Sequence, residues 1–120
     1  MNEEGAYGRT IELMGLLKPP TALFALTGNE AAGALRALHE LGLKIPEDVS
    51  LLTFDNNSWT NLVSPALDVI EQPVEEMGLE AVKVLINAIE NKALEPLKKR
   101  FLGRLIQRGS CAAPKSDSSR

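Results

Sequence analysis

The chain has 120 residues, of which 44% are hydrophobic, 24% charged and 4% aromatic, and its formal net charge is −3. This composition predicts one soluble globular domain at most, with a core of Leu, Ile, Val and Ala. No cluster of Lys and Arg offers the phosphate neutralisation that duplex DNA requires, so we expect no nucleic-acid binding by this chain alone. A single cysteine, Cys111, excludes an internal disulfide, and no run of residues reaches transmembrane length. An acidic start without a signal peptide further favours a cytoplasmic protein with no membrane partner.

Hydrophobic periodicity and the positions of Gly and Pro divide the chain into alternating helices and strands. In chain order we predict a frayed segment at 1–5, a helix at 6–17, a strand at 22–26, a helix that begins at 27–29 and ends at Gly42, a strand at 49–54, a polar loop at 55–61, a strand at 67–71, a helix at 73–91 and a strand at about 101–108. The continuously apolar run 22–26 is typical of a strand covered on both faces. This order predicts an α/β fold, layered helix/sheet/helix, with a mostly parallel sheet.

Polar residues follow three of the predicted strands, at Thr27, Asp55 and Gln72. In an open parallel sheet the carboxyl ends of the strands border the ligand crevice, so these side chains can converge although they are distant in sequence. A carboxylate accepts hydrogen bonds from vicinal hydroxyls, while the amide and the hydroxyl both donate and accept. This set suits a polyhydroxylated or nucleoside-like ligand, with Phe54 or Trp59 as an apolar wall for its carbon face.

Each of these residues also has a purely structural interpretation. An Asp at the end of a strand commonly caps a turn, and Gln72 can cap the helix that follows it. Trp59 can instead cover the core or anchor an interface, and the turn at 27–29 lacks the glycine-rich surroundings of a phosphate cradle. Chemistry alone leaves both interpretations open.

The residue sets of known catalytic and metal sites are missing from the sequence. The one histidine, His39, falls at a predicted surface position of a helix, and no Cys/His cluster has metal spacing. Neither a Gly-x-Ser-x-Gly elbow nor a P-loop is present. The acidic residues Glu71, Glu75 and Glu76 are better explained as charge at a helix N-terminus, where it is favourable to the helix dipole, than as a catalytic set. We therefore predict no enzymatic activity, no cofactor and no metal.

Two segments, GLKIPEDVSLLTFDN at 42–56 and SPALDVIEQPVEEMG at 64–78, resemble the effector-binding domain of the lactose repressor (LacI/GalR) family of bacterial transcription regulators. The resemblance extends from about Gly5 to Cys111. It implies a periplasmic binding protein type I-like fold, with only the C-terminal subdomain present. On this basis residues 1–111 are a partial effector-binding domain and residues 112–120 a disordered tail.

The resemblance also implies roles for single residues. Asp55 matches the family's effector-binding Asp, and Gln72 matches a position often used for the same purpose. Thr27 stands where the family has an Asn, and Gly28 replaces its usual polar neighbour. Asn29 lies one position late and compensates only if the turn shifts, which bears on the identity of the ligand.

The resemblance predicts the effector-sensing and dimerising portion of a bacterial repressor that lacks its DNA-binding domain. Its partners would be a sugar or related polyol, and operator DNA only through the missing N-terminal domain. The crossover helix 73–91 would pack on a missing first subdomain before the return strand at about 101–108, so its uncovered apolar stripe predicts a homodimer or a domain-swapped oligomer. The alternatives are a fragment of a solute-binding protein for sugar transport and a freestanding oligomerisation module.

Overall fold

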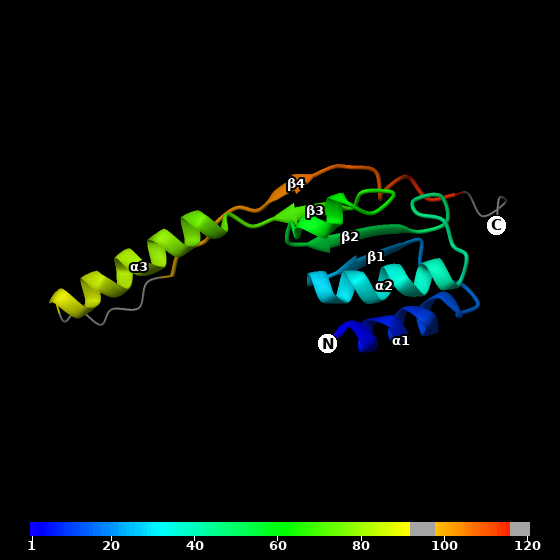
Figure 1. Ribbon diagram of the computed structural model, residues 1–120, viewed down its shortest axis with the longest axis horizontal. Helices are drawn as coiled ribbons and strands as arrows, with labels where there is room; N and C mark the ends of the chain where they lie inside the picture. Colours follow the sequence, from blue (N-terminus) through cyan, green and yellow to red (C-terminus); the bar gives the residue numbers. More distant parts are fainter. Residues whose placement is uncertain (92–97, 116–120) are drawn as a thin grey trace. The chain divides into compact units, whose positions relative to one another are not determined.

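The computed structural model describes residues 1–91 and 98–115 (Figure 1). Its elements are α1 (Glu3–Met14), β1 (Ala22–Ala25), α2 (Gly28–Glu40), β2 (Ser50–Phe54), the short 3-10 helix η1 (Ser58–Asn61), β3 (Asp68–Glu71), α3 (Val74–Asn91) and β4 (Arg104–Ile106). Contacts within the chain divide it into two compact units. The first is Met1–Glu71 together with the segment from Leu105 onward, and the second is Gln72–Arg104.

The strands form one sheet in the order β1-β2-β3-β4. The pair β1 and β2 is parallel, with Ala22 opposite Ser50 and Ala25 opposite Thr53. The pair β2 and β3 is also parallel, with Phe54 opposite Ile70. The predicted α/β fold with a mostly parallel sheet is confirmed.

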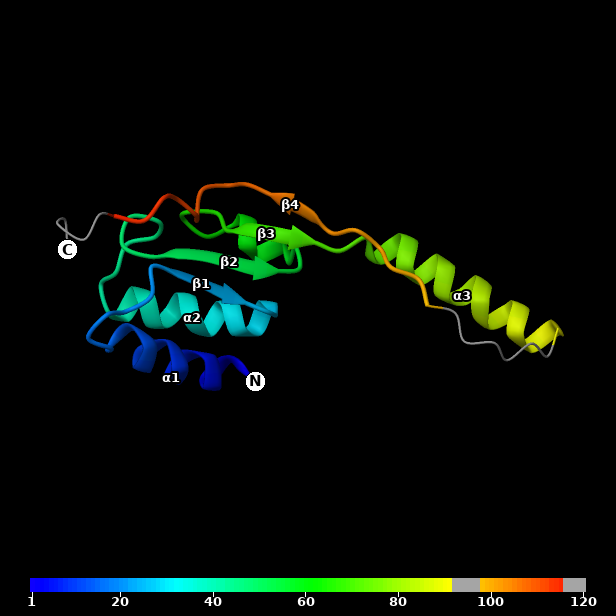
Figure 2. The ribbon, with the colours of Figure 1, turned by 180° about the vertical axis from the view of Figure 1, so that it is seen from behind.

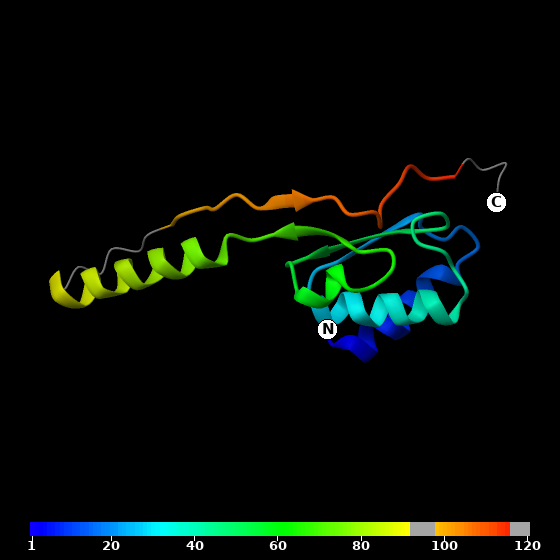
Figure 3. The ribbon, with the colours of Figure 1, turned by 45° about the horizontal axis from the view of Figure 1, so that its top comes forward.

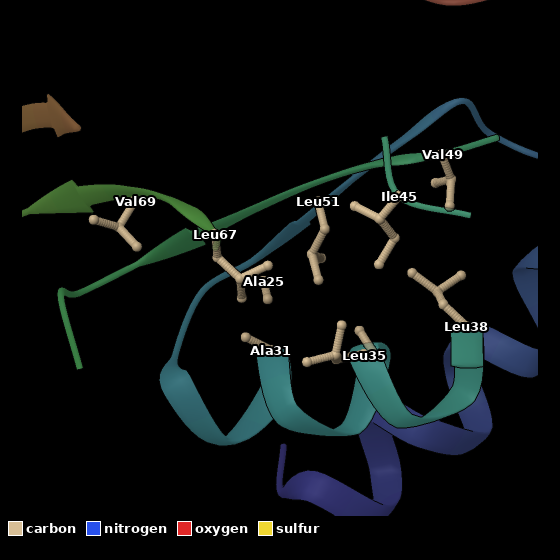
Figure 4. Packing of buried hydrophobic residues seen from close by; sticks show 10 residues of the cluster. Ala25, Ala31, Leu35, Leu38, Ile45, Val49, Leu51, Leu67 and Val69 are labelled. Carbon is tan, nitrogen blue, oxygen red and sulfur yellow. The ribbon is translucent and has the colours of Figure 1, made fainter. Parts of the chain in front are cut away.

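Helix α2 packs against β1 and β2, and α1 packs along α2 (Figures 1 and 2). The tilted view also shows both helices on the same side of the first three strands (Figure 3). Leu35 and Leu38 of α2 point from the helix toward β2 and the segment that leads into it (Figure 4). The buried cluster consists of Ala25, Ala31, Ala34, Leu35, Leu38, Ile45, Val49, Leu51, Leu67 and Val69. Aliphatic side chains and alanines thus form the core, as the composition predicts.

The backbones of α1 and α2 approach each other most closely at Gly33. A Cβ atom on this residue would lie 2.2 Å from the carbonyl oxygen of Glu3 and 2.9 Å from the backbone nitrogen of Tyr7. Beside this contact, the Arg36 guanidinium lies 4.2 Å from the centroid of the Tyr7 ring and donates to Glu4 at 2.9 Å. The absence of a side chain at position 33 is therefore what allows the two helices to pack here.

The first helix begins earlier than the sequence pattern predicted. It starts at Glu3 because the side chain of Asn2 accepts a hydrogen bond from the backbone N–H of Gly5 at 2.8 Å. Such a cap satisfies a backbone donor that would otherwise be lost at the helix end. The prediction of a frayed segment at 1–5 is wrong, and the helix also ends earlier than expected, at Met14.

Two features of the strands also differ from prediction. In β1, Phe24 keeps 50% of its surface exposed and Ala22 is exposed, so full cover of both faces is wrong for this strand. Strand β4 has three residues rather than the predicted eight, consistent with the weak strand propensity of Gly103 immediately before it. Near the C-terminus, Lys115 donates to Asp48 at 2.8 Å, and residues 116–120 of the predicted disordered tail lie outside the described residues.

The second unit is built around α3, which begins directly after Pro73. None of its residues is buried. The large apolar side chains of this helix that stay exposed are Val74, Met77, Leu79, Val82, Leu85, Ile86 and Ile89. An amphipathic helix with an open apolar face is stabilised when that face is covered. Within residues 1–91 and 98–115, no helix is long and apolar enough to cross a membrane.

Candidate functional site

The carboxyl ends of the first three strands meet at one edge of the sheet. Because Ala25 lies opposite Thr53 in a parallel pair, the chain leaves both strands toward the same edge. There the Thr53 hydroxyl donates to the carbonyl oxygen of Thr27 at 3.4 Å. The backbone N–H of Asp55 donates to the carbonyl oxygen of Ile70 at 2.9 Å, which links the end of β2 to β3. This is the edge where ligands bind in open parallel sheets.

Asp55 is the one described residue other than glycine with a positive φ, at 80°. A side chain in this region of conformational space costs on the order of 1–3 kcal/mol and persists only where the surrounding structure imposes it. Such strain is concentrated at functional sites. The residue is half-buried and lies directly after the last residue of β2. Its backbone conformation is an observation, independent of sequence resemblance, that singles out Asp55.

The side chain of Thr27 has a structural role at the start of α2. Its hydroxyl oxygen accepts from the backbone N–H of Glu30 at 3.2 Å, and the Glu30 carboxylate accepts from the backbone N–H of Leu26 at 3.0 Å. This reciprocal arrangement caps the N-terminus of the helix, as the turn chemistry predicted. The hydroxyl proton of Thr27 can still be donated, and Asn29 is exposed in the first turn.

The N-terminus of α2 contacts the loop after β2. A Cβ atom at Gly28 would lie 2.8 Å from Oδ1 of Asn57, so the bare glycine makes room for that side chain. The structure therefore brings the predicted residues of two strand ends, Thr27 and Asp55, to one edge with their loops in contact.

The two aromatic candidates lie against other parts of the first unit. The Phe54 ring is 6.4 Å from the ring of Phe24, at an interplanar angle of 38°. Trp59, on η1, packs against the buried cluster, which corresponds to the alternative in which it covers the core. Gln72 is half-buried, and its carbonyl oxygen accepts from the backbone N–H of Val74 at 2.9 Å. It is the first residue of the second unit, whereas the other five predicted site residues belong to the first.

A polar network that the sequence analysis missed lies in the loop after β2. Arg108 donates through Nη2 to Oδ1 of Asn56 at 2.7 Å and through Nη1 to Oγ1 of Thr60 at 2.9 Å. The Asn56 amide in turn donates to the Glu71 carboxylate at 2.7 Å. The only signal in the sequence is an Arg at the end of the predicted last strand, and such a residue usually faces solvent.

A second missed cluster surrounds Asp68, the first residue of β3, which is 6% exposed. Its carboxylate oxygen Oδ1 accepts from the backbone N–H groups of Arg108, Gly109 and Ser110 at 2.8, 2.7 and 3.1 Å. Burial acts to raise the pKa of Asp68, but these three donors hold it below its usual value. Burial and the nearby Asp68 charge raise the pKa of the Cys111 thiol, so the reactive thiolate is disfavoured.

Two apolar hollows lie beside β1. One, of about 250 Å³, is lined by residues of α1, β1 and α2 that include Thr10, Leu13 and Phe24. Another, of about 310 Å³, is lined by β1, β2 and the segment at Cys111. Neither is lined by Asp55. Across the described ranges, no group of three or more His, Cys, Asp or Glu side chains is arranged to hold a metal ion.

Comparisons with known proteins agree with the fold described above. A family model described as a periplasmic binding protein-like domain matches residues 2–111. The HTH-type transcriptional repressor PurR of Escherichia coli O1:K1 is 38% identical over 109 residues, which are 91% of this chain and 32% of PurR. The chain thus spans about a third of the length of this curated relative.

Solved structures give the same result. A LacI family transcriptional regulator from Enterococcus faecium with bound ribose is 35% identical with a TM-score of 0.81. Another from Enterococcus faecalis V583, also with bound ribose, is 33% identical with a TM-score of 0.83. Each similarity covers 93% of this chain and 41% of the other protein's chain. The chain therefore belongs to the periplasmic binding protein-like domain family and corresponds to part of the effector-binding domain of LacI-family transcriptional regulators.

Proposed function

We propose that this chain contributes part of the effector site of a bacterial transcriptional repressor, and that Asp55 accepts hydrogen bonds from hydroxyl groups of the effector. The observation that carries the proposal is the left-handed backbone of Asp55 at the carboxyl edge of the sheet. A carboxylate held in one orientation suits two adjacent hydroxyls, and the nearby Thr27 hydroxyl adds a donor. Gln72 is the proposed third contact, since it matches a ligand-binding position of the family.

A sugar or related polyol is the proposed class of effector. Ribose is bound in two solved relatives that are 35% and 33% identical to this chain. In this chain the capping role of Thr27 commits its oxygen to the N-terminus of α2. We therefore expect Thr27 to act toward a ligand as a donor only, with Asn29 as the nearest amide in sequence that could both donate and accept.

The chain alone should bind its effector weakly, because it spans 41% of the ribose-bound relatives and so supplies only a share of the contacts. In the complete protein, binding would shift the population of two conformations with different affinity for operator DNA. With a net charge of −3, this chain is proposed not to contact the operator DNA itself. We further propose that it acts in the cytoplasm and catalyses no reaction, because its curated relative PurR is a transcriptional repressor.

The effector proposal is tested by nuclear magnetic resonance of the ¹⁵N-labelled chain titrated with ribose, other pentoses, hexoses and nucleosides. We expect shifts at the backbone amides of Thr27 and Asp55 at millimolar ligand, and their loss in Asp55→Asn. Glu47→Gln is the matched control, because it removes an exposed carboxylate just before the opposite end of β2. No response to any of these ligands, or an unchanged response in Asp55→Asn, would contradict the proposal, and micromolar affinity would contradict the weak binding that we expect of the chain alone.

Self-association through α3 is a second proposed function, favoured by the exposed apolar side chains of that helix. Soluble proteins seldom leave a contiguous apolar surface of this kind open, and covering it by a second copy or by exchange of the helix would stabilise both chains. A freestanding oligomerisation module is the form that this function would take if no effector binds.

A further inference from the structure

Arg108 is the side chain that ties together segments far apart in the sequence. Its guanidinium donates to Asn56 and Thr60 in the loop after β2, and to the carbonyl oxygen of Leu67 just before β3, at 3.4 Å. Thr60 is fully buried, and its hydroxyl donates to the carbonyl oxygen of Asn57 at 2.6 Å. A planar guanidinium presents its donors in a fixed fork, so these bonds fix both position and orientation of the groups that accept them.

The bonds of Arg108 fall at both ends of the loop that carries Asp55 and Trp59. Asn56 follows Asp55 directly, and Thr60 follows Trp59. Thr60 is also linked to β3, since its carbonyl oxygen accepts from the backbone N–H of Leu67 at 2.8 Å. A left-handed residue needs neighbours that impose its conformation, and bonds to the very next residue meet this need.

The same network reaches the two points at which the chain passes between its units. Asn56 donates to Glu71, the last residue of the first unit before the chain leaves it. Arg108 lies three residues beyond Leu105, where the chain re-enters that unit. The loop that carries Asp55 is therefore linked by hydrogen bonds to both connecting segments.

We propose that Arg108 is a positioning residue for the Asp55 site, which holds the 55–61 loop on the sheet and thereby keeps Asp55 in its left-handed conformation. The functional half of this proposal rests on the proposed role of Asp55 as a ligand contact. The positioning half, that Arg108 holds the loop in place, concerns the free protein and can be tested without a ligand. No catalytic or direct ligand contact is assigned to Arg108.

Amide hydrogen exchange of the loop, measured on the 120-residue chain without ligand, tests the positioning half. A hydrogen bond to a charged group contributes enough that its loss shifts a local opening equilibrium roughly tenfold. We therefore expect exchange at residues 57–61 to accelerate by about that factor in Arg108→Ala. Acrylamide quenching of Trp59, the single tryptophan, should increase in parallel.

Variants at three positions distinguish the effect of the forked geometry of the Arg108 guanidinium from the effect of its charge and from general destabilisation. Arg108→Lys keeps the charge but loses the two-pronged donation, so we expect a loop nearly as open as in Arg108→Ala. Asn56→Ala removes one acceptor of Arg108. In the double variant with Arg108→Ala it should add little further acceleration of exchange, since both substitutions break the same hydrogen bond. Arg9→Ala removes an exposed guanidinium from α1 and should leave the loop unchanged.

If Arg108→Ala fails to fold, Asn56→Ala alone carries the test, because Asn56 is exposed and its loss leaves the core intact. Unchanged loop exchange in the folded variants would overturn the proposal, and so would acceleration of equal size at core amides such as Leu51 and Val69. Titration with ribose then tests the functional half. A loosened loop with weakened ribose shifts supports both halves, whereas a loosened loop in a protein that never responds to ribose contradicts the effector role alone.

Discussion

The carboxylate of Asp68 accepts a hydrogen bond from the backbone N–H of Gly109 at 2.7 Å, although 41 positions of the chain separate the two residues. The same oxygen accepts from the residues on either side of Gly109. Three successive backbone donors thus wrap one carboxylate, and they fasten the segment after β4 to the start of β3. This segment carries Arg108, so the fastening also fixes the base of the side chain that reaches the Asp55 loop.

Asp68 should make the stability of the protein depend on pH in the acid range. Its folded-state pKa lies below the value of about 3.9 expected in the unfolded chain, so the stabilisation is present above that value. It is lost as the pH falls through the folded-state pKa, because the carboxyl must then protonate. We expect the free energy of unfolding, measured with urea between pH 7 and pH 2, to fall less steeply in Asp68→Asn than in the parent chain.

Asp68→Asn should also be less stable than the parent chain at neutral pH by about 1–3 kcal/mol, because buried backbone donors lose their charged acceptor. The Asp48 pKa is also lowered, by the hydrogen bond from Lys115, so the difference between the two proteins is the informative quantity rather than either curve alone. If the free energy of unfolding falls equally in both proteins through the acid range, Asp68 is not the source of the pH dependence.

Gly33→Ala should destabilise the first unit. The new Cβ would lie 2.2 Å from the backbone carbonyl oxygen of Glu3, so the two helices must separate. Overpacking of this kind costs about 1–3 kcal/mol, more than the helix propensity that alanine gains over glycine. Gly8→Ala is the matched control, since nothing lies within 4 Å of its Cβ position, and this variant should be neutral or slightly stabilising in urea unfolding.

Local patterns were sufficient to predict much of this fold. The apolar stripe of α2 and the left-handed Gly42 after it, with φ of 71°, follow from spacing and from glycine at a helix end. The early start of α1 was missed, although Asn2 is a good capping residue, because apolar spacing does not report a cap. The exposure of Phe24 was missed because an apolar run indicates a strand but does not show what covers it.

The candidate site, like the fold, could be predicted only where local sequence patterns determine it. Asp55 and Thr27 follow strands, and their meeting at one edge is a consequence of parallel pairing that the sequence could predict. The left-handed backbone of Asp55 could not be predicted, because Asp tolerates this conformation but nothing in the local sequence requires it. The bonds from Arg108 to Asn56 and Thr60 join positions 48 or more apart, and no local pattern encodes them.

The backbone strain at Asp55 predicts an unusual order of stability between two variants. Asp55→Gly and Asp55→Ala both remove the carboxylate, so they differ only in how well they tolerate a φ of 80°. Glycine adopts this conformation freely, whereas in alanine it costs about 1–2 kcal/mol of conformational free energy. We expect Asp55→Gly to be the more stable by about 1 kcal/mol after the greater flexibility of its unfolded state is counted.

Thermal unfolding followed by circular dichroism measures this difference, and both variants should lose the ribose response. An alanine variant as stable as the glycine variant would show that Asp55 relaxes out of the left-handed region. The inference from strain to function would then fail.

Charge introduced on the apolar face of α3 should dissociate the proposed dimer. Leu85 is 61% exposed in the single chain, and burying a leucine contributes about 1.5–3 kcal/mol, counted once in each copy. Light scattering should therefore give the parent chain about twice its mass of 13.0 kDa, and Leu85→Glu a mass near 13.0 kDa at the same concentration. Glu90→Lys, an exposed charge reversal on the same helix, is the control that should leave the association intact. A parent chain that stays monodisperse at 13.0 kDa at high concentration would exclude self-association, and the open face of α3 would then require a partner other than a second copy.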